Sequence, residues 1–271
     1  MTEVLAQFQG DEATADSGSA LAFLDRLENS DQLTRLRERT YALIRDMTGA
    51  PGAVAPPRGV DVGCGAGRAV AELRGRGLQA TGVDRSDLML QAARGRHPHL
   101  PFLEAGAEDL PFEDHSLDWY RAERLYLHLP DPAAALAEAR RVLAPGGAIV
   151  LIDPICDSGA VDSAYPEVTR AIGDALVQAC PNARAATRNH ADLAAAGFGE
   201  ITPHCHTIMA TELAEAAPLL VDLGLATATG LDLVGPAQAA EWLDDLRRRD
   251  AAGRMLAVMT FTITVARAPA A

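Results

Sequence analysis

The chain of 271 residues lacks several features, and each absence excludes a class of protein. It contains no lysine, so all 24 basic residues are arginine, and 37 acidic residues bring the net charge to −13. Proteins that bind phosphate backbones or anionic membranes carry a basic surface, so neither is an expected partner. No apolar run reaches the roughly 18 residues of a membrane helix. The first residues show no basic segment followed by an apolar stretch, so a signal peptide is not expected.

Cysteine is also scarce, with four residues that lie far apart. No Cys-x-x-Cys spacing occurs, which argues against a zinc ribbon or a disulfide scaffold and favours a reducing cytoplasm. The stretch His204-Cys205-His206 looks at first like a set of metal ligands. On a strand, however, the two histidines would share one face and the cysteine would point to the other. We therefore expect no metal site.

From residue 58 the chain alternates short apolar stretches with helical patterns, which predicts a doubly wound α/β fold with a parallel sheet. The predicted strands of this region are 59–62, 79–83, 102–104, 117–122 and 148–152, and the predicted helices between them are 66–73, 86–94 and 133–143. A Pro145-Gly146-Gly147 turn is expected to end the last of these helices.

The remaining segments are less regular. Residues 20–47 read as helical, and a Gly/Pro-rich stretch at 48–57 separates them from the core. After residue 154 the predicted helices are 165–180, 189–196, 211–225 and 236–250, and the predicted strands are 201–209 and 255–265. Asn189 is expected to cap the start of its helix. We divide the chain into a helical segment at 1–57 that contributes to a cap, a ligand-binding core at 58–153, and residues 154–271, which complete the sheet and add helical cap insertions.

A glycine-rich turn follows the first predicted strand, with the sequence Asp61-Val62-Gly63-Cys64-Gly65-Ala66-Gly67. Glycines allow the backbone to turn sharply and to approach a ligand at a helix N-terminus. The third glycine comes one residue earlier than in the dinucleotide motif G-x-G-x-x-G. A carboxylate at the end of the strand suits a ligand with an ammonium group better than one with a pyrophosphate.

At these residues the chain resembles the class I S-adenosylmethionine-dependent methyltransferases, whose first motif is (E/D)-x-G-x-G-x-G. Asp84 ends the second strand at the spacing of a ribose-binding acid. The stretches 105–112, 116–118 and 140–147 are similar to the family's adenine loop, its fourth strand and its helix–turn–strand segment. The resemblance covers about residues 58–153 and is strongest to the ubiquinone/menaquinone-biosynthesis type, known as type 11.

The resemblance implies a Rossmann-like sheet of seven strands with the last strand antiparallel, and S-adenosyl-L-methionine as the cofactor. Gly106 stands where the family often has Asp or Asn, so recognition of the adenine is expected to depend on Ala107 and Glu108. The expected cofactor-binding residues are Asp61, Gly63, Gly65, Gly67, Asp84, Arg85, Met89, Ala107, Glu108 and Arg121.

His128 is the candidate catalytic residue. The family often has two adjacent histidines before Leu-Pro-Asp, and this chain keeps only the second of them. A neutral imidazole beyond the fourth strand could take a proton from an acceptor hydroxyl, and the alternative is a histidine that only packs.

Charged residues are unusual at the end of a central strand, where Arg121, Glu123 and Arg124 stand. The functional interpretation places Arg121 beside the cofactor and Glu123, Arg124 and Tyr126 beside the substrate. A structural ion pair, with Tyr126 packed in the interior, is the alternative.

Together these features predict a cytoplasmic S-adenosylmethionine-dependent methyltransferase that transfers a methyl group to carbon or oxygen of a small, mostly apolar metabolite. A homodimer is left open. The alternatives are an enzyme that uses the same pocket for cyclisation or decarboxylation, a non-catalytic nucleotide-binding protein, and a nicotinamide-dependent oxidoreductase.

Overall fold

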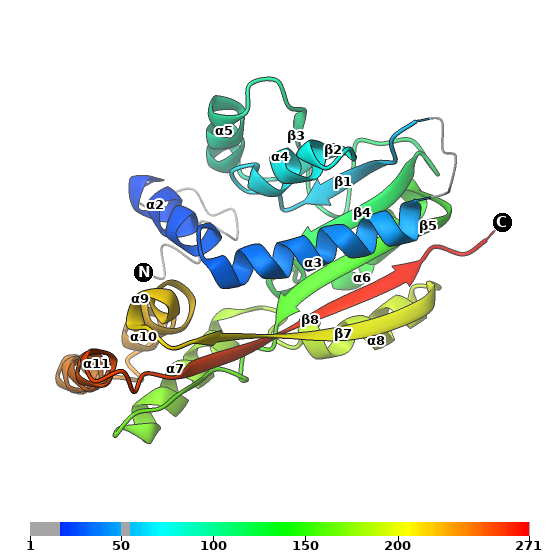
Figure 1. Cartoon of the computed structure of the whole chain (residues 1–271). Coiled ribbons are helices and arrows are strands. Elements are labelled where there is room, and N and C mark those ends of the chain that lie inside the picture. Colours follow the sequence, from blue (N-terminus) through cyan, green and yellow to red (C-terminus); the bar gives the residue numbers. More distant parts are fainter. Residues whose placement is uncertain (1–16, 50–54, 271) are drawn as a thin grey trace. The chain divides into compact units, whose positions relative to one another are not determined.

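A computed structural model describes residues 17–49 and 55–270, which pack as two compact units (Figure 1). The core unit contains residues 35–153, 185–204 and 262 to the end of the described chain. The helical unit contains the described residues up to 34 together with 154–184 and 205–261. The division into three segments and the role of the helical segments as a cap stay predictions.

The sheet has the strand order β3-β2-β1-β4-β5-β8-β6, and β7 pairs with β8. The first five strands pair in parallel, with Val60 of β1 opposite Thr81 of β2 and Tyr120 of β4. The strands are β1 (Arg58–Val62), β2 (Gln79–Asp84), β3 (Phe102–Glu104), β4 (Leu117–Glu123), β5 (Leu143–Pro154), β6 (Ala160–Val161), β7 (Gly199–Ala210) and β8 (Ala257–Arg267).

This order, with β8 as the antiparallel last strand, confirms the predicted Rossmann-like sheet. β6 is an additional strand, and at two residues it is too short to produce a periodic pattern. The predicted Pro-Gly-Gly turn lies inside β5 rather than before it. It coincides with a register shift between the Leu117–Leu143 and Trp119–Ala148 pairs, and Gly146 there has φ 76°.

Helices cover both faces of the core sheet. α3 lies across one face, and α6 and α8 lie on the other (Figure 1). α6 begins at Pro132, and the Asp131 carboxylate accepts a hydrogen bond from the Ala134 backbone N–H at 3.1 Å, so both start signals in the sequence operate. The helices of this unit are α3 (Asp31–Thr48), α4 (Arg68–Gly75), α5 (Asp87–Arg96), α6 (Pro132–Val142) and α8 (Ala185–Ala195), with a short 3₁₀ turn η1 (Tyr126–His128) after β4.

Two helix predictions were wrong in detail. The stretch 20–47 forms two helices, α2 (Ser17–Glu28) and α3, because the chain breaks at Asn29-Ser30, residues that compete with helical hydrogen bonds. α8 begins at Ala185, so Asn189 lies in its second turn and is not a cap. The added residues Ala185 and Ala186 are strong helix formers and extend the helix toward its N-terminus.

The helical unit packs around α7. A Cβ atom on Gly224 of α10 would lie only 2.5 Å from Cγ2 of Ile172 of α7, so the two backbones approach closely. The Trp242 indole N–H donates to the Thr169 hydroxyl at 3.0 Å. This unit contains α2, α7 (Pro166–Ala179), α9 (Leu213–Ala216), a π-helical segment (Ala217–Asp222), α10 (Leu223–Gly230) and α11 (Pro236–Ala251). No helix in the described ranges combines the length and the apolar character needed to cross a bilayer.

Candidate functional site

The glycine turn lies at the carboxyl end of β1 and leads into α4. Gly63, Gly65 and Gly67 adopt φ angles of 70°, 52° and 84°, a region that favours glycine. The backbone N–H groups of Gly63 and Cys64 both donate to the Val83 carbonyl of β2, at 2.8 and 3.0 Å. A Cβ atom on Gly67 would lie 2.6 Å from the Phe102 ring, so packing also requires glycine there. The turn is therefore fixed to the end of the neighbouring strand.

Asp84 ends β2 and closes the same turn. One of its carboxylate oxygens accepts from the Gly65 N–H at 2.8 Å and the other from the Ser86 N–H at 3.0 Å. Burial raises the pKa of the Asp84 carboxyl, and hydrogen bonds from the backbone of Ser86, Gly65 and Arg85 limit the rise. The structure thus brings together two residues, Gly65 and Asp84, that the sequence assigned to one ligand.

Asp61, Arg121 and Glu123 form a buried ion cluster beside the turn. Arg121 donates to Asp61 Oδ1 at 2.5 Å and to Glu123 Oε2, and its side chain is 1% exposed. Burial raises the pKa of Asp61, and Arg121 opposes this rise. Burial would also raise the pKa of Glu123, but Arg121, Arg124 and Arg37 outweigh it and lower that pKa. These contacts are those expected of the alternative in which the charged residues form a structural ion pair. Direct contact of Asp61, Arg121 or Glu123 with a ligand stays a prediction.

α3 contributes a second layer to this cluster that the sequence did not indicate. The Arg121 Nε atom donates to the Thr40 hydroxyl at 3.4 Å, and its guanidinium carbon lies 5.3 Å from the centre of the Tyr41 ring. The Tyr41 hydroxyl donates to Glu72 of α4 at 2.8 Å, and Arg37 donates to the same carboxylate at 3.2 Å. Because these residues are about 30 or more positions apart in the chain, no local spacing could have shown them together.

His128 closes the turn η1 after β4. Burial, aided by the positive charges of Arg124 and Arg85, lowers its pKa to about 4, so the imidazole is neutral at pH 7. Its Nδ1 atom is enclosed by the protein. Arg124, which precedes the turn, has φ 54° although it is not glycine, and such a backbone is strained. The sequence predicted the position of this histidine beyond a strand end, and its catalytic role stays a prediction.

Tyr126 lies in the interior of the core unit. It is 0% exposed, and its hydroxyl lies 3.2 Å from that of Tyr120 of β4. Burial raises the pKa of Tyr126 well above its usual value. Contact with a substrate would require it to move, so the packing alternative describes this structure better.

Asp153 and Asn189 are polar residues beside the same turn that the sequence analysis missed. Asp153 is 0% exposed at the end of β5, and it accepts hydrogen bonds from the Leu127 N–H at 3.3 Å and from Asn189 Nδ2 at 3.1 Å. The signal that singled out Asp84, an acid directly after an apolar strand, is present at Asp153 as well. Asn189 had no comparable signal.

The predicted adenine loop follows β3. Ala107 is buried and Glu108 is exposed, and a Cβ atom on Gly106 would lie 2.9 Å from the Glu108 carboxyl group. A larger residue at 106 would therefore require the exposed carboxyl end of Glu108 to shift. Arg85 is exposed just before α5, whereas Met89 is buried on that helix.

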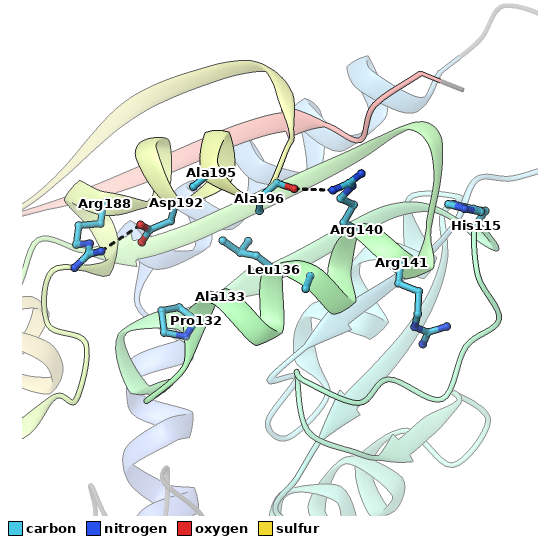
Figure 2. A pocket seen from close by; sticks show the side chains of 11 residues that line it. His115, Pro132, Ala133, Leu136, Arg140, Arg141, Arg188, Asp192, Ala195 and Ala196 are labelled. Carbon is cyan, nitrogen blue, oxygen red and sulfur yellow. Dashed lines mark hydrogen bonds and ion pairs between the residues drawn. The ribbon is translucent and has the colours of Figure 1, made fainter.

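A groove with a volume of about 610 Å³ lies between α6 and α8 (Figure 2). Figure 2 shows Arg188 paired with Asp192 and Arg140 directed at the Ala196 carbonyl, at 3.4 and 3.3 Å. No residue of the predicted site lines this groove. Within the described ranges, no group of three or more His, Cys, Asp or Glu side chains is placed to hold a metal ion.

The residues at the strand ends fit a nucleoside with an amino-acid tail. A carboxylate has about four acceptor positions, so Asp84 keeps capacity for a hydroxyl donor beside its backbone hydrogen bonds. Gly65, which bonds to the same carboxylate, is only half-buried, so the turn offers bare backbone next to that acid. The Asp61–Arg121 pair places both signs of charge beside the turn, although the two side chains are bonded to each other and only 3% and 1% exposed.

Comparison with known proteins places these motifs in a family. A family described as "Methyltransferase domain" matches residues 60–151. An uncharacterized 37.1 kDa protein of transposon TN4556 from Streptomyces fradiae is 34% identical over 262 residues, which is 92% of this chain and 71% of that protein. A demethylmenaquinone methyltransferase of Chlorobaculum tepidum is 37% identical over 106 residues, but this covers only 39% of the chain and 44% of that enzyme.

Solved structures agree on the fold. A putative methyltransferase from Bacillus halodurans superposes with a TM-score of 0.55 at 20% identity. The match covers 84% of this chain and 98% of that structure, so the likeness extends beyond the glycine-turn region.

Proposed function

Because the chain belongs to the class I S-adenosylmethionine-dependent methyltransferases, we propose that it methylates a small, largely apolar molecule at an ionisable hydroxyl or at the carbon beside it. The observation that carries the acceptor part of this proposal is the place of His128, which is half-buried at the end of η1 after β4 and has its Nδ1 atom enclosed by the protein. The positive charges of Arg124 and Arg85 help to lower its pKa, so the imidazole is neutral at pH 7. The name of the Chlorobaculum tepidum relative, demethylmenaquinone methyltransferase, supports an apolar ring as one acceptor class. A cytoplasmic setting and a homodimer stay predictions.

The cofactor would be held by the glycine turn and by two acids. S-adenosylmethionine, when bound, supplies an electrophilic methyl group on a positively charged sulfur. In this proposal Asp84 accepts a ribose hydroxyl while it keeps the Gly65 N–H, and the Asp61–Arg121 pair binds the amino-acid tail. Ala107 and Glu108 would bind the adenine, and Met89 and Arg85 would contribute to the same cofactor site.

His128 would act on the acceptor. Its Nδ1 atom is enclosed, so we assign proton acceptance to Nε2. A neutral imidazole in position contributes about 10²–10⁴-fold to a reaction that removes a proton. The same cations that lower the pKa of His128, Arg124 and Arg85, would also lower the pKa of an acceptor hydroxyl next to it. Phenols and enols respond most usefully to this environment, because their anions are the reactive nucleophiles.

The direct test supplies methyl-deuterated S-adenosylmethionine to the purified protein with a panel of acceptors. The panel contains a phenol, a naphthoquinol, a cyclic 1,3-diketone and, as a contrast, an aliphatic amine. We expect a mass increase on at least one of the first three, and fragmentation then distinguishes methylated oxygen from methylated carbon. His128→Gln should lower the turnover about 10²-fold and change the affinity for S-adenosylhomocysteine less than threefold.

The alternatives give different results in the same experiment. Conversion of an acceptor without incorporation of the label would support a cyclising or decarboxylating enzyme. Tight S-adenosylhomocysteine binding with no conversion of any acceptor would support a non-catalytic binding protein. Binding of NADH in place of S-adenosylhomocysteine would overturn the cofactor assignment.

A further inference from the structure

The turn η1, which carries His128, donates backbone hydrogen bonds to a buried carboxylate, that of Asp153 on β5. Asp153 Oδ1 accepts the Leu127 N–H at 3.3 Å, and the backbone N–H of Tyr126 also donates to this carboxylate. Both donors lie in η1, directly before His128. The backbone on which the imidazole stands is therefore tied to the carboxyl end of β5.

A second tie comes from α8. Asn189 Nδ2 donates to Asp153 Oδ2 at 3.1 Å, and Asn189 itself is 1% exposed. Asp153 thus uses one oxygen for the turn and the other for the helix. The carboxylate joins three segments that are separated by 26 and 36 positions in the chain.

Burying the Asp153 carboxylate costs free energy of desolvation. Burial raises the pKa of Asp153 to about 6, and the nearby Glu123 adds to the rise. Its hydrogen-bond donors are neutral amides. An apolar side chain would avoid the desolvation cost but would leave buried backbone N–H groups of the turn without an acceptor.

We propose that Asp153 and Asn189 are positioning residues that hold His128 at the height required for proton transfer, an inference that rests on the proposed methyl transfer. A misplacement of about 1 Å at a reacting group can cost about 10²-fold in rate. Neither residue contacts the acceptor; both act through the backbone of η1.

The test uses substitutions at position 189 of the full chain. Asn189→Leu removes the donor, and Asn189→Asp places two carboxylates against each other. The double variant Asp153→Asn with Asn189→Asp exchanges donor and acceptor and keeps an oxygen for the Leu127 N–H. Arg188→Ala is the matched control, because Arg188 is the preceding residue of α8 and is 64% exposed.

With an acceptor found in the panel, we expect kcat to fall at least tenfold in both single variants. The exchanged pair should recover to within about threefold of the parent chain, and the dissociation constant for S-adenosylhomocysteine should stay within twofold throughout. In a His128→Gln background, Asn189→Leu should have no further effect, because residues that act through one another are not additive. Additive losses, or a kcat loss no larger than that of Arg188→Ala, would overturn the proposal.

A second readout keeps the inference testable if no acceptor of the panel is methylated or if Asn189→Leu is poorly folded. The chain has seven histidines, and loss of one imidazole Hε1 signal in His128→Gln identifies the signal of His128 by NMR. We expect this signal to shift in Asn189→Asp, to return toward its original position in the exchanged pair, and to stay unchanged in Arg188→Ala. An unshifted signal in Asn189→Asp would contradict the positioning role, whereas a shift with no methylated acceptor would count only against the proposed function.

Discussion

At the scale of single residues, three buried acids at the carboxyl edge of the sheet stabilise three different parts of the candidate site. Asp84 closes the glycine turn, Asp61 pairs with a buried guanidinium, and Asp153 ties down the turn of His128. All three have a raised pKa because they are buried. The sequence identified two of them through the glycine motif, and it passed over Asp153 because no glycine or motif accompanies that strand end.

Replacement of Asp84 by alanine should weaken the binding of S-adenosylhomocysteine. Loss of a hydrogen bond between a carboxylate and a hydroxyl costs about 1.5–3 kcal/mol, which is about 10- to 150-fold in Kd. Titration calorimetry measures this change, and circular dichroism checks the fold. Asp87→Ala is the control, because Asp87 is exposed on α5, where its carboxylate accepts a hydrogen bond from the Gln91 side chain. An affinity equal to that of the parent chain would remove Asp84 from the cofactor site.

Asp153 should make the folded state less stable as the pH rises. Its pKa is about 6 in the folded chain against a usual 3.8, so the folded state binds the proton more tightly than the unfolded state. The extra stability is present below about pH 4 and is lost as the pH rises to about 6, with a total near 3 kcal/mol. Relative to the parent, Asp153→Asn should therefore gain stability between pH 4 and 7 in urea unfolding.

The control for that experiment is Asp157→Asn, an exposed carboxylate four residues further on. Its stability relative to the parent should stay nearly constant over the same interval. A parallel pH profile for Asp153→Asn and the parent chain would show that this carboxyl does not titrate abnormally.

At the scale of elements, the sequence predicted the alternating region well because most strands there are short, largely apolar runs that end at a glycine or an acid. It predicted the helical unit less well. The small residues of 211–230 show no clear periodicity, and the structure divides this stretch among α9, a π-helical segment and α10. The contacts of α3 with α4 were also beyond prediction, because Tyr41 and Glu72 lie 31 positions apart and no local pattern links them.

The contact between α3 and α4 should depend on Glu72. Its carboxylate accepts hydrogen bonds from the Tyr41 hydroxyl and from Arg37, whose side chain is only 3% exposed. Glu72→Ala leaves both donors without this acceptor and should cost about 1–3 kcal/mol of unfolding free energy. Glu38→Ala is the matched control, because Glu38 of α3 pairs with Arg76, the residue directly after α4, and its side chain is 50% exposed. Surface pairs of this kind contribute about 1 kcal/mol or less. Equal losses of unfolding free energy in the two variants would show that the more buried position of Glu72 does not increase its contribution to stability.

At the scale of the whole molecule, charge is the dominant property. A net charge of −13 on 271 residues gives a repulsive field that favours solubility and opposes compactness. The ion pairs on the surface, such as Arg247–Asp244, are exposed and individually weak. Repulsion over longer distances should therefore decide how salt affects the chain.

We expect sodium chloride to stabilise the protein at pH 8. The screening length falls from about 30 Å at 0.01 M to about 8 Å at 0.15 M, which removes most of the repulsion between distant acids. The midpoint of urea unfolding should rise over this range. Near pH 5, close to the isoelectric point of about 4.9, the same addition should have little effect. A midpoint that falls with salt at pH 8 would mean that attractive pairs outweigh the net charge.

The chain has two tryptophans, and each unit contains one of them. Trp119 stands on β4 of the core unit, where its indole N–H donates to the Pro57 carbonyl, and Trp242 stands on α11 of the helical unit. Both rings are fully buried. Their fluorescence therefore forms a pair of internal reporters: with Trp119→Phe the emission follows the helical unit alone, and with Trp242→Phe it follows the core unit. Stopped-flow traces of the two variants would reveal which unit loses its structure first.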